Sequence, residues 1–252
     1  MPPWLGNELQ VTAEKQEQLP PVPALDARLL AAAAYVRRGA LVADIGCDHG
    51  KLAVYLARTG AARRVVAADI RPAPLARARA LVEKHRCGAA VECRLGDGLH
   101  VLSPDEADDI VIAGVSGVTA AEMLAAAPQF WRAGKRFIFV PATKRAELRG
   151  WLWKNGFSLL DETPVQAAGR FYTALCAEYT GREPSLLECA VGLAAKPTPA
   201  AAGYLRHVAK LVRKYTLGVP LAENAPFVQL AGQVDAMAER CEQEAQKWML
   251  KK

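Results

Sequence analysis

Short apolar runs alternate with amphipathic segments between residues 41 and 155, and this alternation constrains the fold more than any other feature. The apolar runs expected to be strands are 41–45, 64–70, 91–95, 109–113 and 136–140. The segments with helical spacing are 51–58, 74–85, 119–127 and 144–155. Strands that alternate with helices form βαβ units, so we predict a parallel sheet with helices on both faces.

The alternation stops after Gly156. Two strand-like runs follow, 157–165 and 170–179, and the linker between them has no room for a helix. We therefore predict an antiparallel hairpin at the edge of the sheet. An ordinary dinucleotide-binding domain ends in a sixth parallel strand, so the hairpin argues against that class.

The flanking regions predict two further parts. A helix is expected at 25–36, and the proline-rich run before it cannot continue a helix. Two apolar helical faces near the C-terminus predict an antiparallel helical hairpin. These faces comprise Tyr204, Leu205, Val208, Leu211, Val212 and Tyr215, and then Phe227, Leu230, Val234, Met237, Cys241 and Trp248. The predicted division is an arm at 1–24, an α/β domain at 25–181 and a helical, coiled-coil-like domain at 182–252.

Composition bounds the class of protein. The chain of 252 residues is 52% apolar and 23% charged, which is ordinary for a globular protein, and its formal net charge is +6. That charge fits either a solvated basic surface or a surface that binds nucleic acid. The basic face of the predicted hairpin, with Lys210, Arg213 and Lys214, leaves the same choice between simple packing and the gripping of a large substrate.

Several classes are not favoured by the sequence. No apolar stretch approaches the length that spans a bilayer, and the first residues do not resemble a secretory signal. The six cysteines lack CxxC spacing, which argues against a zinc site and against a disulfide framework. We expect a cytoplasmic protein without metal, and a monomer.

The loop after the first predicted strand points to a nucleotide-like cofactor. Gly46 follows Asp44 and lets the backbone approach a ligand, and Gly50 opens the next helix, whose N-terminus offers free N–H groups. Asp48 places a carboxylate where a pyrophosphate would sit in a dehydrogenase. A cofactor with a sulfonium and an ammonium group suits this loop better. The alternative is that Asp48 only caps the following helix.

Two more acidic residues follow the next strands. Asp69 ends the second strand, where a carboxylate can accept hydrogen bonds from ribose hydroxyls, although Asp is also suited to a turn before Arg71 and Pro72. Asp97 follows the third strand, where it can accept from an adenine amino group. The carboxyl ends of successive parallel strands form the ligand crevice of open α/β sheets, so these residues support one another.

At these positions the sequence resembles the bacterial tRNA (adenine-N1)-methyltransferases that modify adenine 22 in the D-arm. The resemblance rests on ADIGCDHG at 43–50, GDGL at 96–99 and IAGVSG at 112–117, and it extends from about residue 25 to the end. It implies S-adenosyl-L-methionine as cofactor and tRNA as substrate. The implied fold is α/β, a class I methyltransferase Rossmann-like sheet with an antiparallel edge hairpin and a C-terminal helical hairpin.

The expected site follows from the residue pattern and this resemblance. Asp48 and His49 are the candidate catalytic residues, and His49 is equally suited to a simple helix start. The expected cofactor-binding residues are Asp44, Gly46, Cys47, Asp48, Asp69, Ile70, Asp97, Gly98 and Gly114. The expected substrate-binding residues are Arg28, Ser116, Gly117, Pro141 and Thr143.

The acceptor side departs from the family pattern. Val115-Ser116-Gly117 stands where the family has Met-Gly-Gly, and Val140-Pro141-Ala142 stands where it has Gln-Pro-Asn. An amide expected near the target adenine is therefore missing, and Ser116 and Thr143 are the polar side chains available in its place. Three functions stay open: a tRNA adenine-N1 methyltransferase, a methyltransferase of the same fold with another RNA or small-molecule acceptor, and a catalytically weak cofactor- and RNA-binding protein. A nicotinamide dehydrogenase is a distant fourth.

Overall fold

The computed structural model describes residues 19–180, 186–215, 217 and 221–249. Its strands are β1 (Ala40–Ile45), β2 (Ala62–Asp69), β3 (Val91–Leu95), β4 (Asp109–Ala113), β5 (Arg136–Val140), β6 (Phe157–Ala167) and β7 (Arg170–Tyr179). Its α-helices are α1 (Ala27–Tyr35), α2 (Lys51–Arg58), α3 (Pro72–Lys84), α4 (Gly117–Ala125), α5 (Arg145–Lys154), α6 (Leu186–Val191), α7 (Pro199–Tyr215) and α8 (Leu221–Met249). Three short 3-10 helices are η1 (Gly98–Val101), η2 (Pro104–Glu106) and η3 (Pro128–Phe130).

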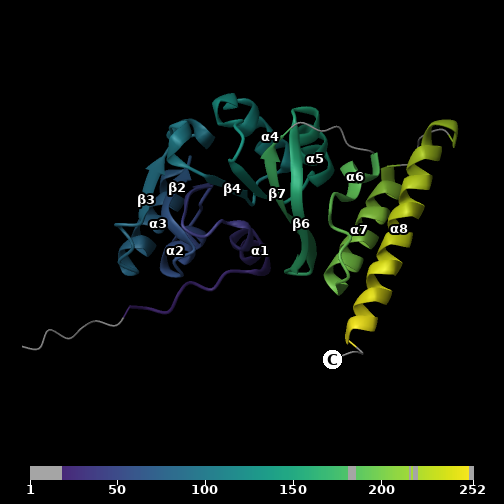
Figure 1. Ribbon diagram of the computed structural model, residues 1–252, viewed down its shortest axis with the longest axis horizontal. Coiled ribbons are helices and arrows are strands. Elements are labelled where there is room, and N and C mark those ends of the chain that lie inside the picture. Colours follow the sequence, from purple (N-terminus) through teal and green to yellow (C-terminus); the bar gives the residue numbers. More distant parts are fainter. Residues whose placement is uncertain (1–18, 181–185, 216, 218–220, 250–252) are drawn as a thin grey trace, which may run out of the picture.

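The strands form one seven-stranded sheet in the order β3-β2-β1-β4-β5-β7-β6 (Figure 1). The first five strands are parallel, and β7 pairs antiparallel with both β5 and β6. The predicted parallel sheet and antiparallel edge hairpin are therefore confirmed. The order reverses between β1 and β4, and a ligand crevice forms where a parallel sheet reverses in this way.

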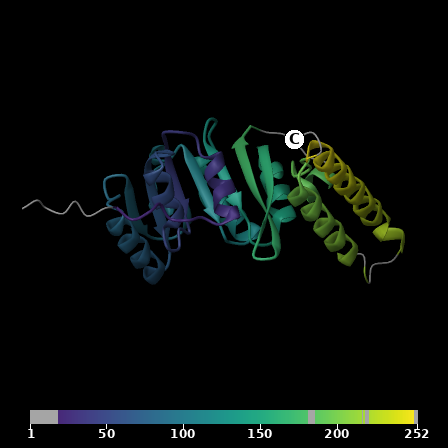
Figure 2. The ribbon, with the colours of Figure 1, turned by 90° about the horizontal axis from the view of Figure 1, so that it is seen from below.

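Each face of the sheet packs against its own set of helices (Figure 2). One core layer joins the sheet to α1, α2 and α3 and includes Ala32, Leu52 and Leu75. The opposite layer joins it to α4 and α5 through Leu124 and Leu148. Strands buried on both faces have nearly continuous apolar sequences, which explains why their ends could be predicted closely.

The C-terminal helices pack beside β6 and β7, and they form a third core of their own (Figure 1). Tyr204, Leu205, Leu230 and Val234 are buried there, which confirms much of the predicted apolar faces. Three expected positions are wrong, because Leu211, Phe227 and Trp248 are exposed. The side chain of Tyr215 and the predicted boundary at 181 lie outside the described residues, as do the first 18 residues of the predicted arm.

Two helical details differ from the prediction. Helix α8 begins at Leu221 instead of residue 227, so Pro226 lies inside it. Proline is tolerated in the first turn of a helix, and Pro226 lies beyond that turn, so α8 lacks the backbone hydrogen bond that an N–H at this position would donate. The short helix α6 was not predicted, because six residues are too few to show helical periodicity.

No described helix is long and apolar enough to cross a membrane. None of the cysteines in the described residues forms a disulfide. Within the part of the chain that the structure describes, no three His, Cys, Asp or Glu side chains come together in a way that could hold a metal ion.

Candidate active site

The loop between β1 and α2 is held in an unusual backbone shape. Gly46 (φ +75°), Asp48 (φ +49°) and Gly50 (φ +69°) all have positive φ. The amides of Gly46 and Cys47 both donate to the carbonyl of Ala68 on β2, at 2.8 and 2.9 Å. A Cβ on Gly46 would meet no described atom within 4 Å, so this backbone faces open space, as a ligand-binding turn requires.

Asp48 does not cap α2. The N-cap residue is Gly50, and no side chain hydrogen-bonds to this helix start, so the capping alternative is wrong. The Asp48 amide donates to Asp69 Oδ2 at 3.0 Å, and its side chain is 59% exposed. Its carboxylate lies 3.7 Å from Arg71 Nη2 and 3.7 Å from His49 Nδ1. The carboxylate is therefore available to a ligand.

Asp44 is the buried charge of the site. It is 3% exposed, and its Oδ2 atom is buried without a hydrogen-bond partner among the described residues. Burial and the nearby charge of Asp69 raise the pKa of Asp44 to about 7, although a hydrogen bond from the Ala53 amide opposes the shift. A buried acceptor without a donor is costly, and a cationic donor from a ligand would satisfy it.

Asp69 serves the turn that was proposed as its alternative role. Its Oδ1 accepts from the Arg71 amide at 2.9 Å, and its Oδ2 accepts from the Asp48 amide. The carboxylate thus joins the loops after β1 and β2 and still lines the crevice. Ile70 beside it is 60% exposed, which is unusual for isoleucine and leaves an apolar surface for a flat ligand.

The loop after β3 completes one side of the crevice. Asp97 is exposed, and its side chain makes no capping hydrogen bond to η1 although it holds the N-cap position. Gly98 has φ +51° and would place a Cβ 3.5 Å from Met123. The Asp97 carboxylate is free to accept a hydrogen bond from a ligand.

Two cavities lie along this crevice. The first, of about 260 Å³, is lined by Asp26, Arg28, Leu29, Asp44, Gly46, Cys47, Asp48, His49, Lys51, Leu52, Ala113, Gly114 and Val140. The second, of about 410 Å³, is lined by Ile45, Gly46, Asp48, Ala68, Asp69, Ile70, Arg71, Gly96, Asp97, Gly98, Ala113, Gly114, Val115 and Met123. They share Gly46, Asp48, Ala113 and Gly114. Every residue predicted to bind the cofactor lines one of the two cavities.

His49 lines the first cavity with its ring 41% exposed. Its Nε2 atom lies 2.8 Å from Arg77 Nη1 on α3. Arginine only donates, so Nε2 must accept and the ring proton belongs on Nδ1, which faces Asp48. Cys47 is buried in the same loop, and burial raises the pKa of its thiol, so it remains protonated.

Arg28 also lines the first cavity, where its guanidinium lies 5.0 Å from the centre of the Tyr172 ring. Asp26 caps α1 and pairs with Arg28 at 2.6 Å. The sequence prediction missed Asp26, Lys51 and Tyr172. The capping pattern before α1 was a usable signal for Asp26, but only the fold brings Tyr172 of β7 to this position.

Four predicted substrate residues do not line the two cavities. Ser116 caps α4 and accepts from the Thr119 amide at 3.1 Å. Gly117 packs closely, because a Cβ there would lie 2.0 Å from the Lys144 carbonyl oxygen. Pro141 is buried, and exposed Thr143 accepts from the Gly117 amide through its carbonyl at 2.9 Å. These residues join the loops after β4 and β5 to each other.

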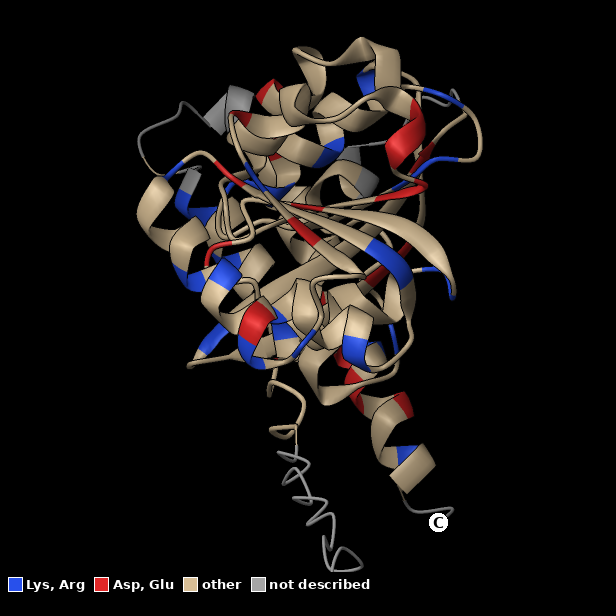
Figure 3. Ribbon diagram, turned by 90° about the vertical axis from the view of Figure 1, so that its left-hand side faces the viewer, with Lys and Arg blue, Asp and Glu red and all other residues tan. Residues whose placement is uncertain are grey.

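The basic residues do not form one patch on the side of the molecule that Figure 3 shows. Lys and Arg lie on several elements there and are interspersed with Asp and Glu. Charge alone therefore does not mark a nucleic-acid surface on that side.

The sheet order, the glycine-rich turn and the acidic crevice define a class I methyltransferase that depends on S-adenosyl-L-methionine. Residues 25–175 match the family described as methyltransferase domain. The chain belongs to the family of the bacterial tRNA (adenine(22)-N(1))-methyltransferases.

The similarity extends to sequence and to solved structures. The tRNA (adenine(22)-N(1))-methyltransferase of Bacillus subtilis (strain 168) is 35% identical over 159 residues, which cover 63% of this chain and 67% of that relative. The solved structure of the B. subtilis m1A22 tRNA methyltransferase TrmK has a TM-score of 0.71 at 27% identity and covers 87% of this chain and 99% of that one. Streptococcus pneumoniae Sp1610, solved with S-adenosyl-L-methionine, has a TM-score of 0.75 at 25% identity and covers 85% and 100%.

Proposed function

We propose that this enzyme transfers the methyl group of S-adenosyl-L-methionine to N1 of an adenine in the D-arm of tRNA. The observation that carries the proposal is the buried Oδ2 atom of Asp44, which has no hydrogen-bond partner among the described residues and lies in a crevice that also presents Asp48, Asp69, Asp97 and open glycine backbone. S-adenosyl-L-methionine carries an ammonium group, ribose hydroxyls and an adenine amino group, and these carboxylates can accept hydrogen bonds from all of them. The B. subtilis relative, named for adenine 22 and N1, supports the acceptor.

The residues present fit the cofactor. We assign Asp44 to the ammonium group, Asp69 and Ile70 to the ribose and the adjoining ring, and Asp97 to the adenine amino group. Gly46, Gly98 and Gly114 all have positive φ, a backbone shape that glycine adopts without the strain that most residues with a Cβ would incur. When bound, the cofactor supplies an activated methyl group on a sulfonium.

The main catalytic task of the chain is alignment. The lone pair of adenine N1 is available near neutral pH, so no covalent enzyme intermediate is needed. Well-oriented reactants can gain about 7–11 kcal/mol from positioning alone. Because N1 is used in base pairing, the adenine must be unpaired or flipped into the pocket.

Asp48 is the candidate catalytic residue. Positive charge develops on the base as its N1 gains the methyl group, and a carboxylate that accepts from the exocyclic amine stabilises that charge. The exposed Asp48 side chain lines both cavities, and His49 with its Nδ1 proton toward Asp48 orients it. Arg28, held by Asp26 and Tyr172, is placed to contact the incoming nucleotide.

A second candidate function is methylation of a different acceptor. The observation that favours it is the altered acceptor side: Ser116 is used as a helix cap, and no amide side chain replaces the missing Gln-Pro-Asn. In this second function the two joined loops are shaped by Ser116, Gly117, Pro141 and Thr143. We also propose that these four residues contact the substrate directly.

We further propose that residues 25–181 form the catalytic domain and that residues 182–252 grip the tRNA. We also propose that the protein is a monomer, and a tRNA substrate supports a cytoplasmic location. Light scattering of the purified protein would test the monomer.

The deciding experiment mixes the protein with unmodified tRNA and S-adenosyl-L-methionine labelled in the methyl group. Digestion to nucleosides should show the label in 1-methyladenosine, and a tRNA with adenine 22 replaced should remain unlabelled. Label in another nucleoside would favour the second candidate. Cofactor and tRNA binding without transfer would reduce the protein to a binding function. The variant Asp48→Asn keeps the size of the side chain and removes its charge. It should lower kcat by about 10²-fold or more if the Asp48 charge stabilises the transition state.

A further inference from the structure

The loop that carries Asp97 and Gly98 is bonded to the sheet at its two ends, where the Gly96 amide donates to the Asp69 carbonyl at 3.1 Å and the Asp108 amide donates to the Leu41 carbonyl at 2.8 Å. Between Gly96 and Asp109 the chain forms only η1 and η2. The backbone amides of His100, Leu102 and Glu106 bond to carbonyls within the same loop. Between its two ends the loop therefore depends on the packing of the buried Leu99 and Leu102 and on side-chain hydrogen bonds for its position on the sheet.

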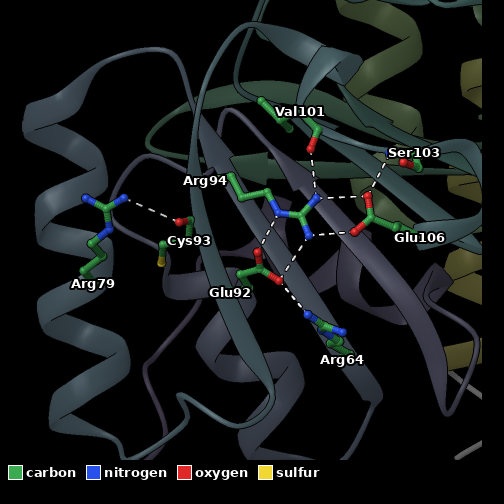
Figure 4. Close-up of polar contacts among 8 residues, drawn as sticks. All are labelled: Arg64, Arg79, Glu92, Cys93, Arg94, Val101, Ser103 and Glu106. Carbon is green, nitrogen blue, oxygen red and sulfur yellow. Dashed lines mark hydrogen bonds and ion pairs between the residues drawn. The ribbon is translucent and has the colours of Figure 1, made fainter.

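Arg94 on β3 provides side-chain hydrogen bonds of this kind (Figure 4). Its Nη1 donates to the Val101 carbonyl at 2.8 Å and to Glu106 Oε2 at 3.0 Å, and its Nη2 donates to Glu106 Oε1 at 2.7 Å. Its Nε and Nη2 donate to Glu92 Oε1 and Oε2 at 2.8 and 3.1 Å. A guanidinium has five N–H groups, and all five are used.

The two glutamates connect the strand to the loop (Figure 4). Glu92 lies on β3 and also accepts from Arg64 of β2 at 2.6 Å, so it anchors Arg94 to the sheet. Glu106 lies at the end of η2 and also accepts from the Ser103 amide at 2.7 Å. Arg94 therefore links the rigid sheet to both short helices of the loop.

The ion pairs with Arg94 stabilise the charged forms of both glutamates. The Arg94 guanidinium lowers the pKa of Glu106 to about 2 and also lowers the pKa of Glu92. Both acids are charged throughout the neutral range, and the Arg94 side chain is only 22% exposed. Bidentate arginine–carboxylate pairs fix orientation as well as distance.

We propose that Arg94 is a positioning residue that holds the loop after β3 in the shape that receives the adenosine half of the cofactor. Arg94 lines neither of the two cavities and acts through Val101 and Glu106 on the loop that presents Asp97 and Gly98. This inference rests on the proposed cofactor placement.

Preorganisation makes the effect measurable. When only a fraction of the molecules has a binding-competent loop, the apparent dissociation constant rises by the inverse of that fraction. Without Arg94 the loop loses its side-chain hydrogen bonds to β3 and keeps only its end bonds and the packing of Leu99 and Leu102, whereas Asp44 and the turn after β1 keep their shape. The cost therefore falls on cofactor binding and not on the transfer step.

The test measures S-adenosyl-L-homocysteine binding by calorimetry in the wild type, Arg94→Gln, Arg94→Lys and Arg64→Gln. If a tenth of the loops stay competent, Arg94→Gln raises the dissociation constant about tenfold. Arg94→Lys should also bind weakly, because one ammonium group cannot reach two carboxylates and a carbonyl. Arg64→Gln removes the outer ion pair and should stay within about twofold, since all five Arg94 bonds remain.

Hydrogen exchange of the cofactor-free proteins supplies the second readout. Arg94→Gln should speed the exchange of amides in 96–107 while α2 and β4 exchange as in the wild type. With saturating cofactor its kcat should be unchanged and only the KM for S-adenosyl-L-methionine raised. Wild-type affinity in Arg94→Gln, or faster exchange over the whole domain, would overturn the inference. A wild type that does not bind S-adenosyl-L-homocysteine would instead refute the proposed function itself.

Discussion

Two arginines of this enzyme do similar chemistry in opposite surroundings. Arg94 lies at the rim of the sheet beside Glu92 and Glu106, with its side chain 22% exposed. Arg149 of α5 pairs with Glu162 of β6, and both side chains are completely buried. Arg149 also donates to the Tyr204 hydroxyl at 2.6 Å and to the Ala190 carbonyl at 2.8 Å, so it ties the C-terminal helices to the sheet.

The difference in burial decides what each network does. A rim arginine can exchange its partners for water, so removing it costs little overall stability and mainly frees the loop that it holds. A buried arginine has no such exchange, and its removal leaves Glu162 charged and unpaired in the interior. Gly192 confirms how closely the buried pair is enclosed, because a Cβ there would lie 2.6 Å from Arg149 Nε.

Removal of the buried arginine is expected to have the largest effect. Arg149→Ala should lower the free energy of unfolding by about 3–5 kcal/mol, since it strands a buried carboxylate. Denaturant unfolding followed by circular dichroism measures this. The double variant Arg149→Met with Glu162→Leu is the control and should recover most of the loss. Equal destabilisation by single and double variants would show that packing, not charge, is what Arg149 supplies.

Asp44 differs from the carboxylates of both arginine networks, because it is a buried carboxylate without a cation beside it in the described part of the chain. Its folded pKa of about 7 lies above the unfolded value, so the cofactor-free protein should lose stability as pH rises from about 4 to 7. Cofactor affinity should change in the opposite sense, because the ammonium group requires the ionised carboxylate. Below pH 7 we expect affinity to fall about tenfold per pH unit, and calorimetry from pH 5.5 to 8 checks it. Asp44→Asn should bind weakly and without this pH dependence; a persisting dependence would assign it to another group.

A high salt concentration should affect the two arginine networks differently. Exposed ion pairs are screened at 1 M salt, whereas buried ones are screened much less. We expect 1 M sodium chloride to speed hydrogen exchange in 96–107 by a few-fold at most, corresponding to less than about 1 kcal/mol. Amides near Arg149 in α5 should be unaffected. Equal acceleration at both sites would contradict the difference in burial as the cause.

The smallest expected effect concerns Glu106. Its folded pKa is lowered to about 2, so its stabilising contribution is present above the unfolded value of 4.5 and is lost as pH falls toward 2. Because the side chain is exposed, this contribution should be below about 1 kcal/mol. The free energy of unfolding of Glu106→Gln should depend less on pH between 4.5 and 2 than that of the wild type. The control is Asp105→Asn, which changes a neighbouring side chain that is 90% exposed. If the stability of Glu106→Gln depended on pH as that of the wild type does, Glu106 would not be part of the stabilising network.

The parts that sequence predicts well are those with local causes. The predicted ranges of β3, β4, β5 and β7 match the observed strands, and the predicted ranges of β1 and β2 differ by one or two residues at an end. The cofactor-side residues lie at strand ends, and topology alone brings strand ends together. The role of Asp48 as a cap was wrong because Gly50, at positive φ, occupies the cap position.

The contacts that sequence misses join segments far apart in the chain. Nothing local pairs Arg149 with Tyr204 or places Tyr172 against Arg28, because both contacts depend on where the β6–β7 hairpin packs. Ser116 and Gly117 show the converse. Their place in a family pattern suggested substrate contact, but each also serves the close packing of two loops, which a pattern does not reveal.

The strand order also sets a sequence of events during synthesis. Strand β7 is the last strand in the chain, yet it lies between β5 and β6. Until residue 179 has left the ribosome, β5 is an open edge with unpaired backbone groups, the kind of edge that pairs with other chains. Strand β7 must then pair with both β5 and β6, and Arg149 receives Tyr204 later still. The growing chain is therefore most exposed to misassembly just before its sheet closes.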